Sequence, residues 1–249
     1  MFNLKHSLRR TLFYLLLIPI FFTTAVKSFA FSDDFTSDPR TNPDWEVQNS
    51  EGMVFDNPGI TLSSTNSSFP YLKTSSSNNL SSNKYHEIKF QYLNSDSNWG
   101  VGASFTDNPP DFPTYFGPVD DYLEYNIAYF FGNHLHSVST LCPKGSPLCP
   151  NNWWFIYPNN PPTNTYMSST PRDFNVHTFS TIRTDHADSL SSYEVYMDGN
   201  LIVETQPTNR IINSIWIGHP SNLDSPKIWP VLRILSVKSL PLPPATFPY

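Results

Sequence analysis

The chain of 249 residues is 39% hydrophobic, 15% aromatic and only 14% charged, a composition that excludes general disorder. Its 24 prolines against 9 glycines argue against a helical bundle or an α/β fold and favour short strands joined by long loops. The formal net charge of −6 disfavours nucleic acid and anionic membrane surfaces as partners.

Residues 1–30 have the pattern of a cleaved secretory signal peptide. A basic start precedes a nearly continuous apolar run over 11–26, and Ser28 and Ala30 place small residues at a cleavage site. The alternative is an uncleaved anchor, but Pro19 interrupts the run, which is shorter than the roughly 20 residues that a span needs. Removal of the segment takes the formal charge from −6 to −10, because it holds four cationic residues and no acid: Lys5, Arg9, Arg10 and Lys27. We therefore predict a secreted or extracellular protein with no membrane contact after cleavage.

Three segments in the first half of the remaining chain alternate with period two, as half-buried strands do. They cover 85–93, 98–105 and 120–131. In the first, the predicted core face consists of His86, Ile88, Phe90 and Tyr92, and the outer face of Tyr85, Glu87, Lys89 and Gln91. In the third, the predicted core face consists of Leu123, Tyr125, Ile127 and Tyr129, and the polar face of Asp120, Tyr122, Glu124 and Asn126.

The second half continues with strands predicted over 177–184, 193–197, 201–205, 211–218 and 231–240. Asp198, Gly199 and Asn200 form a strong hairpin signal between two of them, because glycine accepts a positive φ. Long loops are expected over 62–84, 106–118 and 141–173, and no amphipathic helix follows residue 30. Such a set of short strands predicts an all-β domain over 31–240, a two-sheet antiparallel β-sandwich followed by a proline-rich tail over 241–249.

Cys142 and Cys149 lie in one short loop that is rich in proline and glycine. In an exported protein this spacing predicts a local disulfide that pins the loop. A metal site is not indicated by two cysteines alone, and the Cys-x-x-Cys spacing of redox sites is absent.

Several stretches together resemble the concanavalin A-like lectin/glucanase superfamily, including its laminin G-like domains. They are Phe31–Phe35, Asp44–Val47, His177–Phe179, the Tyr193–Asn200 hairpin, Ile215–Gly218 and Leu232–Val237. The resemblance spans about residues 31–240 and implies a jelly roll in which one concave sheet commonly receives sugars. The glutamate-rich E-x-D-x-x-E strand of the family 16 glycosidases is missing here. Trp45, Trp99 and Trp216 fall on apolar strand faces and are expected to be buried core residues.

The segment Tyr122-Leu-Glu124-Tyr-Asn126 resembles the G-Y-E-x-Q strand of the 3-keto-disaccharide hydrolase-like domains, with Asp121 in place of the glycine and Asn126 in place of the glutamine. Its polar face could hydrogen-bond sugar hydroxyls, and Gly100, Gly102 and Ser104 could leave room for a ligand if the two strands are neighbours. The alternative is the ordinary wet face of an antiparallel sheet. Exposed tryptophans stack on sugar rings, so Trp153 and Trp154 are candidates for a platform, with packing over the end of the sandwich as the alternative.

We expect a carbohydrate-binding module without catalysis as the function. The predicted contact residues are Glu87, Gln91, Tyr122, Glu124, Asn126, Trp153 and Trp154. A first alternative is a glycoside hydrolase with Glu124 as acid or base and Glu87 or Asp120 as its partner carboxyl group. A second is a laminin G-like adhesion module with a protein partner.

No cofactor is predicted, although calcium is possible. Related sandwiches often bind calcium near the first strand, which makes Asp33 and Asp34 weak candidates. No complete calcium loop or metal-ligand motif is present in the sequence.

Overall fold

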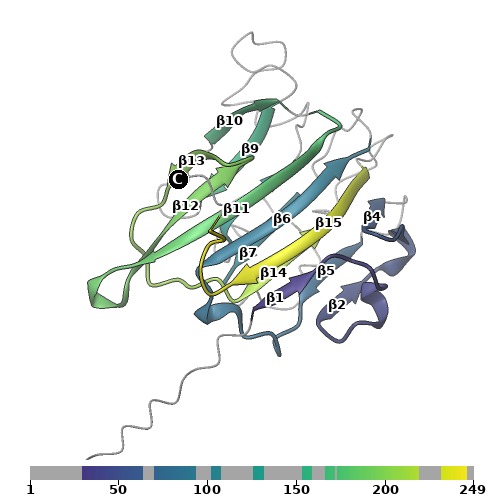
Figure 1. Cartoon of the computed structure of the whole chain (residues 1–249), viewed down its shortest axis with the longest axis horizontal. Helices are drawn as coiled ribbons and strands as arrows, with labels where there is room; N and C mark the ends of the chain where they lie inside the picture. The colour runs from purple at the N-terminus through teal and green to yellow at the C-terminus, as the bar shows by residue number, and fades with distance from the viewer. Residues whose placement is uncertain are drawn as a thin grey trace, which may run out of the picture.

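The computed structural model describes residues 30–63, 70–93, 102–107, 126–131, 153–158, 166–171, 173–218 and 231–245 (Figure 1). Within these ranges the regular structure is strand and short 3-10 helix, and no helix is long and apolar enough to cross a membrane. One sheet has eight strands: β1 (Phe31–Asp33), β3 (Met53–Phe55), β4 (Ile60–Ser63), β6 (Tyr85–Tyr92), β11 (Val176–Asp185), β12 (Ser191–Met197), β13 (Asn200–Glu204) and β15 (Val231–Leu240). The other has seven: β2 (Trp45–Gln48), β5 (Tyr71–Thr74), β7 (Gly102–Thr106), β8 (Asn126–Phe131), β9 (Trp153–Pro158), β10 (Tyr166–Pro171) and β14 (Ser214–Gly218).

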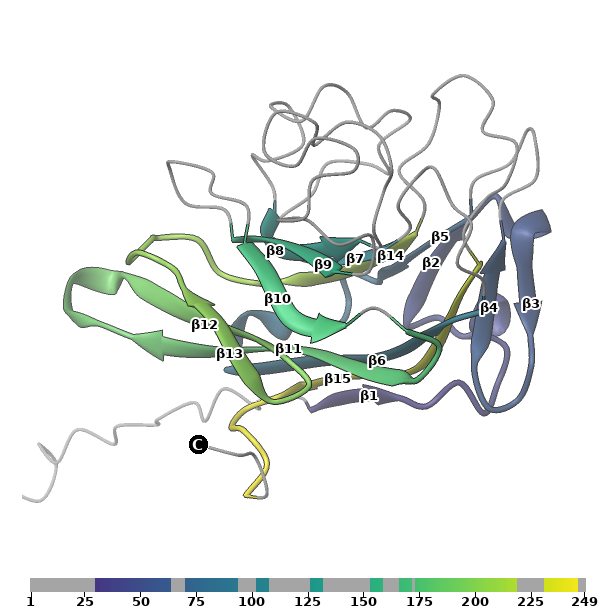
Figure 2. The ribbon, with the colours of Figure 1, turned by 90° about the horizontal axis from the view of Figure 1, so that it is seen from above.

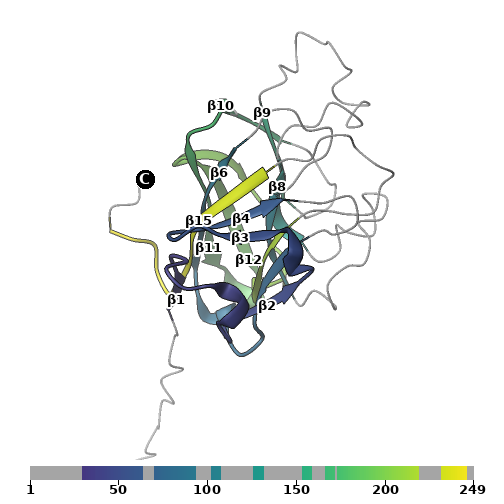
Figure 3. The same cartoon turned by 90° about the vertical axis from the view of Figure 1, so that its right-hand side faces the viewer.

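The two sheets are stacked as two layers, which Figures 2 and 3 show from two directions. The larger sheet has the order β13-β12-β11-β6-β15-β4-β3, with β1 paired to β15, and the smaller has the order β10-β9-β8-β7-β14-β5-β2. All the described strand pairs are antiparallel. The predicted antiparallel β-sandwich is therefore confirmed.

Apolar side chains on the facing surfaces of the two sheets form the core. On β6 the predicted core face is correct, because Ile88, Phe90 and Tyr92 are fully buried in the main cluster. Between the sheets, the ring of Phe105 on β7 stacks on that of Phe179 on β11, with centroids 5.1 Å apart and planes 8° apart. Such aromatic pairs contribute about 1 kcal/mol beyond the area that they bury.

The alternation breaks at one place on β8. Both Ile127 and Ala128 are buried in the core, although neighbouring residues of a regular strand face opposite sides. The register explains this, because Phe105 pairs with Ala128 while Thr106 pairs with Asn126, which leaves Ile127 as the extra residue of a bulge. The burial of Ile127 agrees with the prediction, whereas Leu123 and Tyr125 lie outside the described residues.

Two of the predicted loops contain strands. The stretch 62–84 includes β5, and 141–173 includes both β9 and β10. β5 has only four residues and takes its partners from β2 and β14, which are distant in the sequence. β9 consists of a continuous apolar run without alternation, flanked by asparagine and proline, so periodicity could not separate it from a loop.

The predicted hairpin between β12 and β13 is confirmed. Asp198 and Gly199 both have positive φ, 52° and 77°, as a type I′ turn requires. The turn is anchored by the Asp198 carboxylate, which accepts hydrogen bonds from the backbone N–H of Thr178 at 2.7 Å and lies 2.7 Å from Nδ1 of His177. The anchor ties the hairpin to β11.

His177 bridges two carboxylates at the beginning of β11. Its Nε2 atom lies 3.1 Å from Asp173, opposite the contact of Nδ1 with Asp198, and its ring packs against Phe90. Burial lowers the pKa of His177, but the two carboxylates outweigh burial and raise this pKa above its ordinary value. The protonated ring is therefore the form that the fold favours.

We expect the contribution of His177 to stability to be larger in mild acid than in alkali. Because its pKa is higher in the folded than in the unfolded chain, the stabilisation is complete below the unfolded value and is lost as pH rises through the folded value. His177→Gln should lower the free energy of unfolding by about 1–2 kcal/mol more at pH 5.5 than at pH 9, measured by urea denaturation. His186→Gln is the control, since His186 contacts the hydroxyl of Ser192. An equal loss at both pH values would contradict the prediction.

Candidate functional site

The predicted contact residues are divided between the two sheets. Glu87 and Gln91 lie on β6 of the eight-stranded sheet, whereas Asn126 begins β8 and Trp153 and Trp154 begin β9 of the seven-stranded sheet. Tyr122, Glu124, Cys142 and Cys149 lie outside the described residues. Glu87 and Gln91 therefore do not share a face with Asn126.

Glu87 is held by internal partners on the outer face of β6. Its carboxylate accepts a hydrogen bond from the Tyr85 hydroxyl and lies 3.2 Å from the ammonium of Lys238, its register partner on β15. Burial, followed by the Glu87 carboxylate, raises the pKa of Tyr85 well above its ordinary value. Only 8% of Glu87 is exposed, so these contacts give it a structural role.

Gln91 also makes a contact within the fold. Its side-chain amide donates a hydrogen bond of 2.6 Å to the backbone oxygen of Phe174, just before β11 begins. This hydrogen bond links the residues just before β11 to the neighbouring strand β6. Gln91 thus stabilises the same end of the sheet as His177.

The weak calcium candidates differ in their surroundings. The Asp33 carboxylate is nearly buried and accepts hydrogen bonds from the indole N–H of Trp45 at 2.6 Å, the backbone N–H of Phe35 at 2.7 Å and the amide of Asn42 at 3.2 Å. Asp34 is exposed and accepts from Thr36. Within the described ranges no group of three or more His, Cys, Asp or Glu side chains could hold a metal ion. The contacts of Asp33 are those of a carboxylate that orients the core ring of Trp45.

The outer face of the seven-stranded sheet combines small and aromatic residues. β7 and β8 are neighbours, as the sequence argument required, and β14 pairs with β7 on the other side. On this face Gly102 and Ser104 oppose Gly218 and Trp216 in register. Trp216 is buried, as expected, with 5% of its surface exposed, but it lies on the face opposite Ile215 and Ile217, which point into the main core cluster. Trp45 is in the main core cluster as predicted, and Trp99 and Gly100 lie outside the described residues.

Trp216 packs beside Tyr71 of β5, with ring centroids 5.6 Å apart. Gly218 makes room for this pair, since a Cβ atom there would lie only 2.5 Å from Cδ1 of the Tyr71 ring. The Ile-Trp-Ile alternation over 215–217 contained the signal that Trp216 faces away from Ile215 and Ile217.

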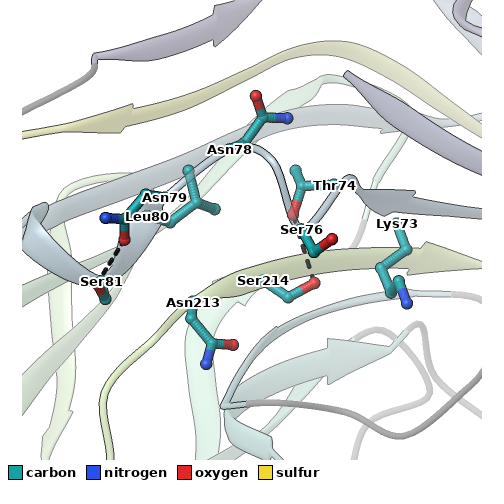
Figure 4. Close-up of a pocket in the computed structure, with 9 residues that line it drawn as sticks. All are labelled: Lys73, Thr74, Ser76, Asn78, Asn79, Leu80, Ser81, Asn213 and Ser214. Carbon is teal, nitrogen blue, oxygen red and sulfur yellow. Dashed lines mark hydrogen bonds between the residues drawn. The ribbon is translucent and has the colours of Figure 1, made fainter. Parts of the chain in front are cut away.

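A pocket of about 310 Å³ adjoins this face where β5 ends and β14 begins (Figure 4). We call it the polar pocket, and it is lined by Lys73, Thr74, Ser76, Asn78, Asn79, Leu80, Ser81, Asn213 and Ser214. Lys73 is the register partner of Trp216, and Ser214 precedes Trp216 by two residues, so both belong to the outer face. Sequence reasoning missed this pocket because its walls come from segments about 140 residues apart.

The positive charge of Lys73 in the polar pocket is balanced by a carboxylate on the neighbouring strand β2. The ammonium of Lys73 lies 2.9 Å from the carboxylate of Glu46, its register partner on β2. The other described lining side chains are uncharged: they offer hydroxyl and amide groups and one leucine. The described lining can therefore donate and accept hydrogen bonds without a net charge.

Comparison with known proteins identifies the fold. No family model matches the sequence, and no curated protein matches it significantly. Among solved structures, one has a TM-score of 0.55 at 10% identity and covers 86% of this chain and 99% of that chain. It was reported with the endo-acting O-glycanases that prominent members of the human gut microbiota express to initiate mucin breakdown. The carbohydrate recognition domain of Emp46p in its metal-free form has a TM-score of 0.55 at 13% identity, covering 86% and 97%.

The exoplasmic domain of VIP36, in a form bound to Ca²⁺ and Man3GlcNAc, has a TM-score of 0.52 at 10% identity, with 88% of this chain and 90% of that chain covered. The chain thus has the antiparallel jelly-roll β-sandwich fold of these structures, which is the fold that the sequence resemblance implied. At such low identity the likeness defines the fold alone.

Asp33→Asn should destabilise the fold far more than the neighbouring substitution Asp34→Asn. The first change weakens three hydrogen bonds around buried Trp45 and should lower the free energy of unfolding by about 2 kcal/mol, whereas the second should change it by less than about 0.5 kcal/mol. Urea denaturation monitored by tryptophan fluorescence measures both. A rise in Tm on adding Ca²⁺ that Asp33→Asn abolishes would contradict the structural role of Asp33.

Proposed function

We propose that this protein is an exported carbohydrate-binding β-sandwich that holds a glycan on the outer face of its seven-stranded sheet without cleaving it. The observation that carries the proposal is the pairing of β7 with β8, which sets Gly102 and Ser104 beside the strand that begins at Asn126. Gly102 and Ser104 are themselves buried, so we propose the ligand contacts for the side chains of β8 and β9 next to them. Solved structures with the same fold include the carbohydrate recognition domain of Emp46p and a glycan-bound form of VIP36.

The chemistry of this face suits a sugar. Carbohydrate hydroxyls both donate and accept hydrogen bonds, and the proposed partners on the β8 side are Tyr122, Glu124 and Asn126. Sugar C–H faces pack on aromatic rings, which is the role that we propose for Trp153 and Trp154. Glu87 and Gln91 are left out of the proposed site because both are engaged in contacts on the other sheet.

Binding without cleavage is favoured by the placement of Glu87. A retaining glycosidase requires two carboxyl groups roughly 5–5.5 Å apart, and an inverting enzyme roughly 6.5–9.5 Å. Glu87 belongs to the outer face of the eight-stranded sheet, so the core separates it from the proposed face. A catalytic role of Glu124 would then need another partner, for which the sequence offers Asp120.

A glycan array probed with the purified chain tests the proposal. We expect binding to at least one glycan family, with a loss of about tenfold or more in Asn126→Ala and Trp153→Ala, because each removes a hydrogen-bonding or stacking group. The matched control is Gln91→Ala, which removes an amide from the other sheet and should leave glycan affinity unchanged. A chain that binds protein partners but no glycan would support the adhesion alternative instead.

Catalysis is tested on any glycan that binds. Release of reducing sugar should stay at background for the wild-type chain and for Glu124→Gln alike. Release by the wild-type chain that Glu124→Gln abolishes, with binding retained, would make the protein a glycoside hydrolase.

Export predicts a mature chain that begins at Phe31. The position is consistent with the fold, because Phe31 is the first residue of β1 and pairs with Ser239 of β15. The intact mass of the protein recovered from the medium or cell surface should lack residues 1–30. A mass that retains them would indicate an uncleaved anchor.

A further inference from the structure

We propose that the polar pocket is a second carbohydrate site, which takes one uncharged sugar ring beside the glycan-binding face. This inference rests on the proposed function and adds to it a location and a ligand class. The pocket volume of about 310 Å³ is at the lower end of the range of ligand sites. A space of that size suits one ring of a longer glycan.

The lining matches the hydrogen-bonding pattern of a polyol. Four hydroxyl groups and three side-chain amides border the pocket, and Leu80 is its single apolar residue among those described. Sugar hydroxyls need donors and acceptors at short intervals, which hydroxyls and amides supply. A predominantly apolar ligand would leave these groups unsatisfied, at a cost in affinity.

Two exposed side chains have groups available for a ligand. Oδ1 of Asn79 accepts the Ser81 hydroxyl at 2.6 Å, which leaves the Asn79 amide nitrogen with no partner among the described residues. The hydroxyl of Ser76 likewise has no hydrogen-bond partner in the part of the chain that the structure describes. A sugar hydroxyl could accept from Asn79 and exchange a hydrogen bond with Ser76.

The walls are fixed before a ligand arrives. The amide of Asn78 donates to the backbone oxygen of Asp44 at 2.8 Å, which also accepts the Ser75 N–H at 2.8 Å. The hydroxyl of Thr74 lies 3.3 Å from that of Ser214 and accepts the N–H of Ile215 at 2.9 Å, and Figure 4 shows the Thr74–Ser214 contact. Such preorganisation lowers the entropy that binding costs.

The ion pair of Lys73 with Glu46 disfavours the binding of an anionic sugar. Because the ammonium is already neutralised at 2.9 Å, an anionic sugar would have to compete with the Glu46 carboxylate for it. The chain as a whole is also acidic, with a formal charge of −6. Both facts favour neutral hexoses and N-acetylhexosamines over uronic or sialic acids.

Titration calorimetry with glucose, galactose, mannose and N-acetylglucosamine tests the inference, with glucuronic acid as the charged comparison. At least one neutral sugar should bind, and glucuronic acid should bind about tenfold more weakly or not at all. Ser76→Trp should fill the pocket and abolish binding, and Asn79→Ala should weaken it several-fold. Both sites are exposed, so the variants should fold, which an unchanged Tm verifies.

The matched control is Ser77→Trp, a substitution at the neighbouring exposed serine, which does not line the pocket. It should leave the sugar affinity unchanged. Binding that survives Ser76→Trp, or that Ser77→Trp abolishes equally, overturns the pocket as a site. Array binding that depends on Asn126, together with no monosaccharide binding by the wild-type chain, refutes only this inference. A failed array with monosaccharide binding that Ser76→Trp abolishes refutes only the proposed outer-face site.

Discussion

Phe105 and Phe179 stack across the space between the sheets, and the arrangement of the whole molecule depends on contacts of this kind. Each strand that carries a core residue must direct alternate side chains outward, because the pleat has a period of two. Because Ile88 and Phe90 face the core, Glu87 and Gln91 on the same strand lie on the outer face of the eight-stranded sheet. Because Ile215 and Ile217 also face this core, Trp216 lies on the opposite face of the seven-stranded sheet, where it is nevertheless buried.

The two exteriors differ in how their polar groups are used. On the eight-stranded sheet, Tyr85, Glu87 and Lys238 satisfy one another across adjacent strands. On the seven-stranded sheet the glycine and serine of β7 lie between the ring of Trp216 and the strand β8. Closed networks of the first kind stabilise the fold, whereas Gly102, Ser104 and Trp216 are buried on their face of the second sheet.

Sequence reasoning predicted the parts of this fold that depend on local pattern. Alternation located β6, β11 and β15, and the positive-φ requirement of the Asp198-Gly199 turn located the β12–β13 hairpin. It failed for β5, whose four residues depend on partners distant in the sequence, and for β9, which is apolar without alternation. Local pattern also grouped Glu87 with Asn126 as contacts of one ligand, since each lies on a polar strand face. Which sheet each strand joins depends on topology, which periodicity does not contain.

The pairing of β1 with β15 has a consequence for how the domain can be attached. Phe31 lies opposite Ser239, so the first and last strands of the sandwich leave from the same layer. A tether joined to either end, whether to a cell envelope or to another domain, would approach from the side of the eight-stranded sheet. The seven-stranded sheet would then be directed away from the point of anchorage, toward whatever the surrounding medium presents.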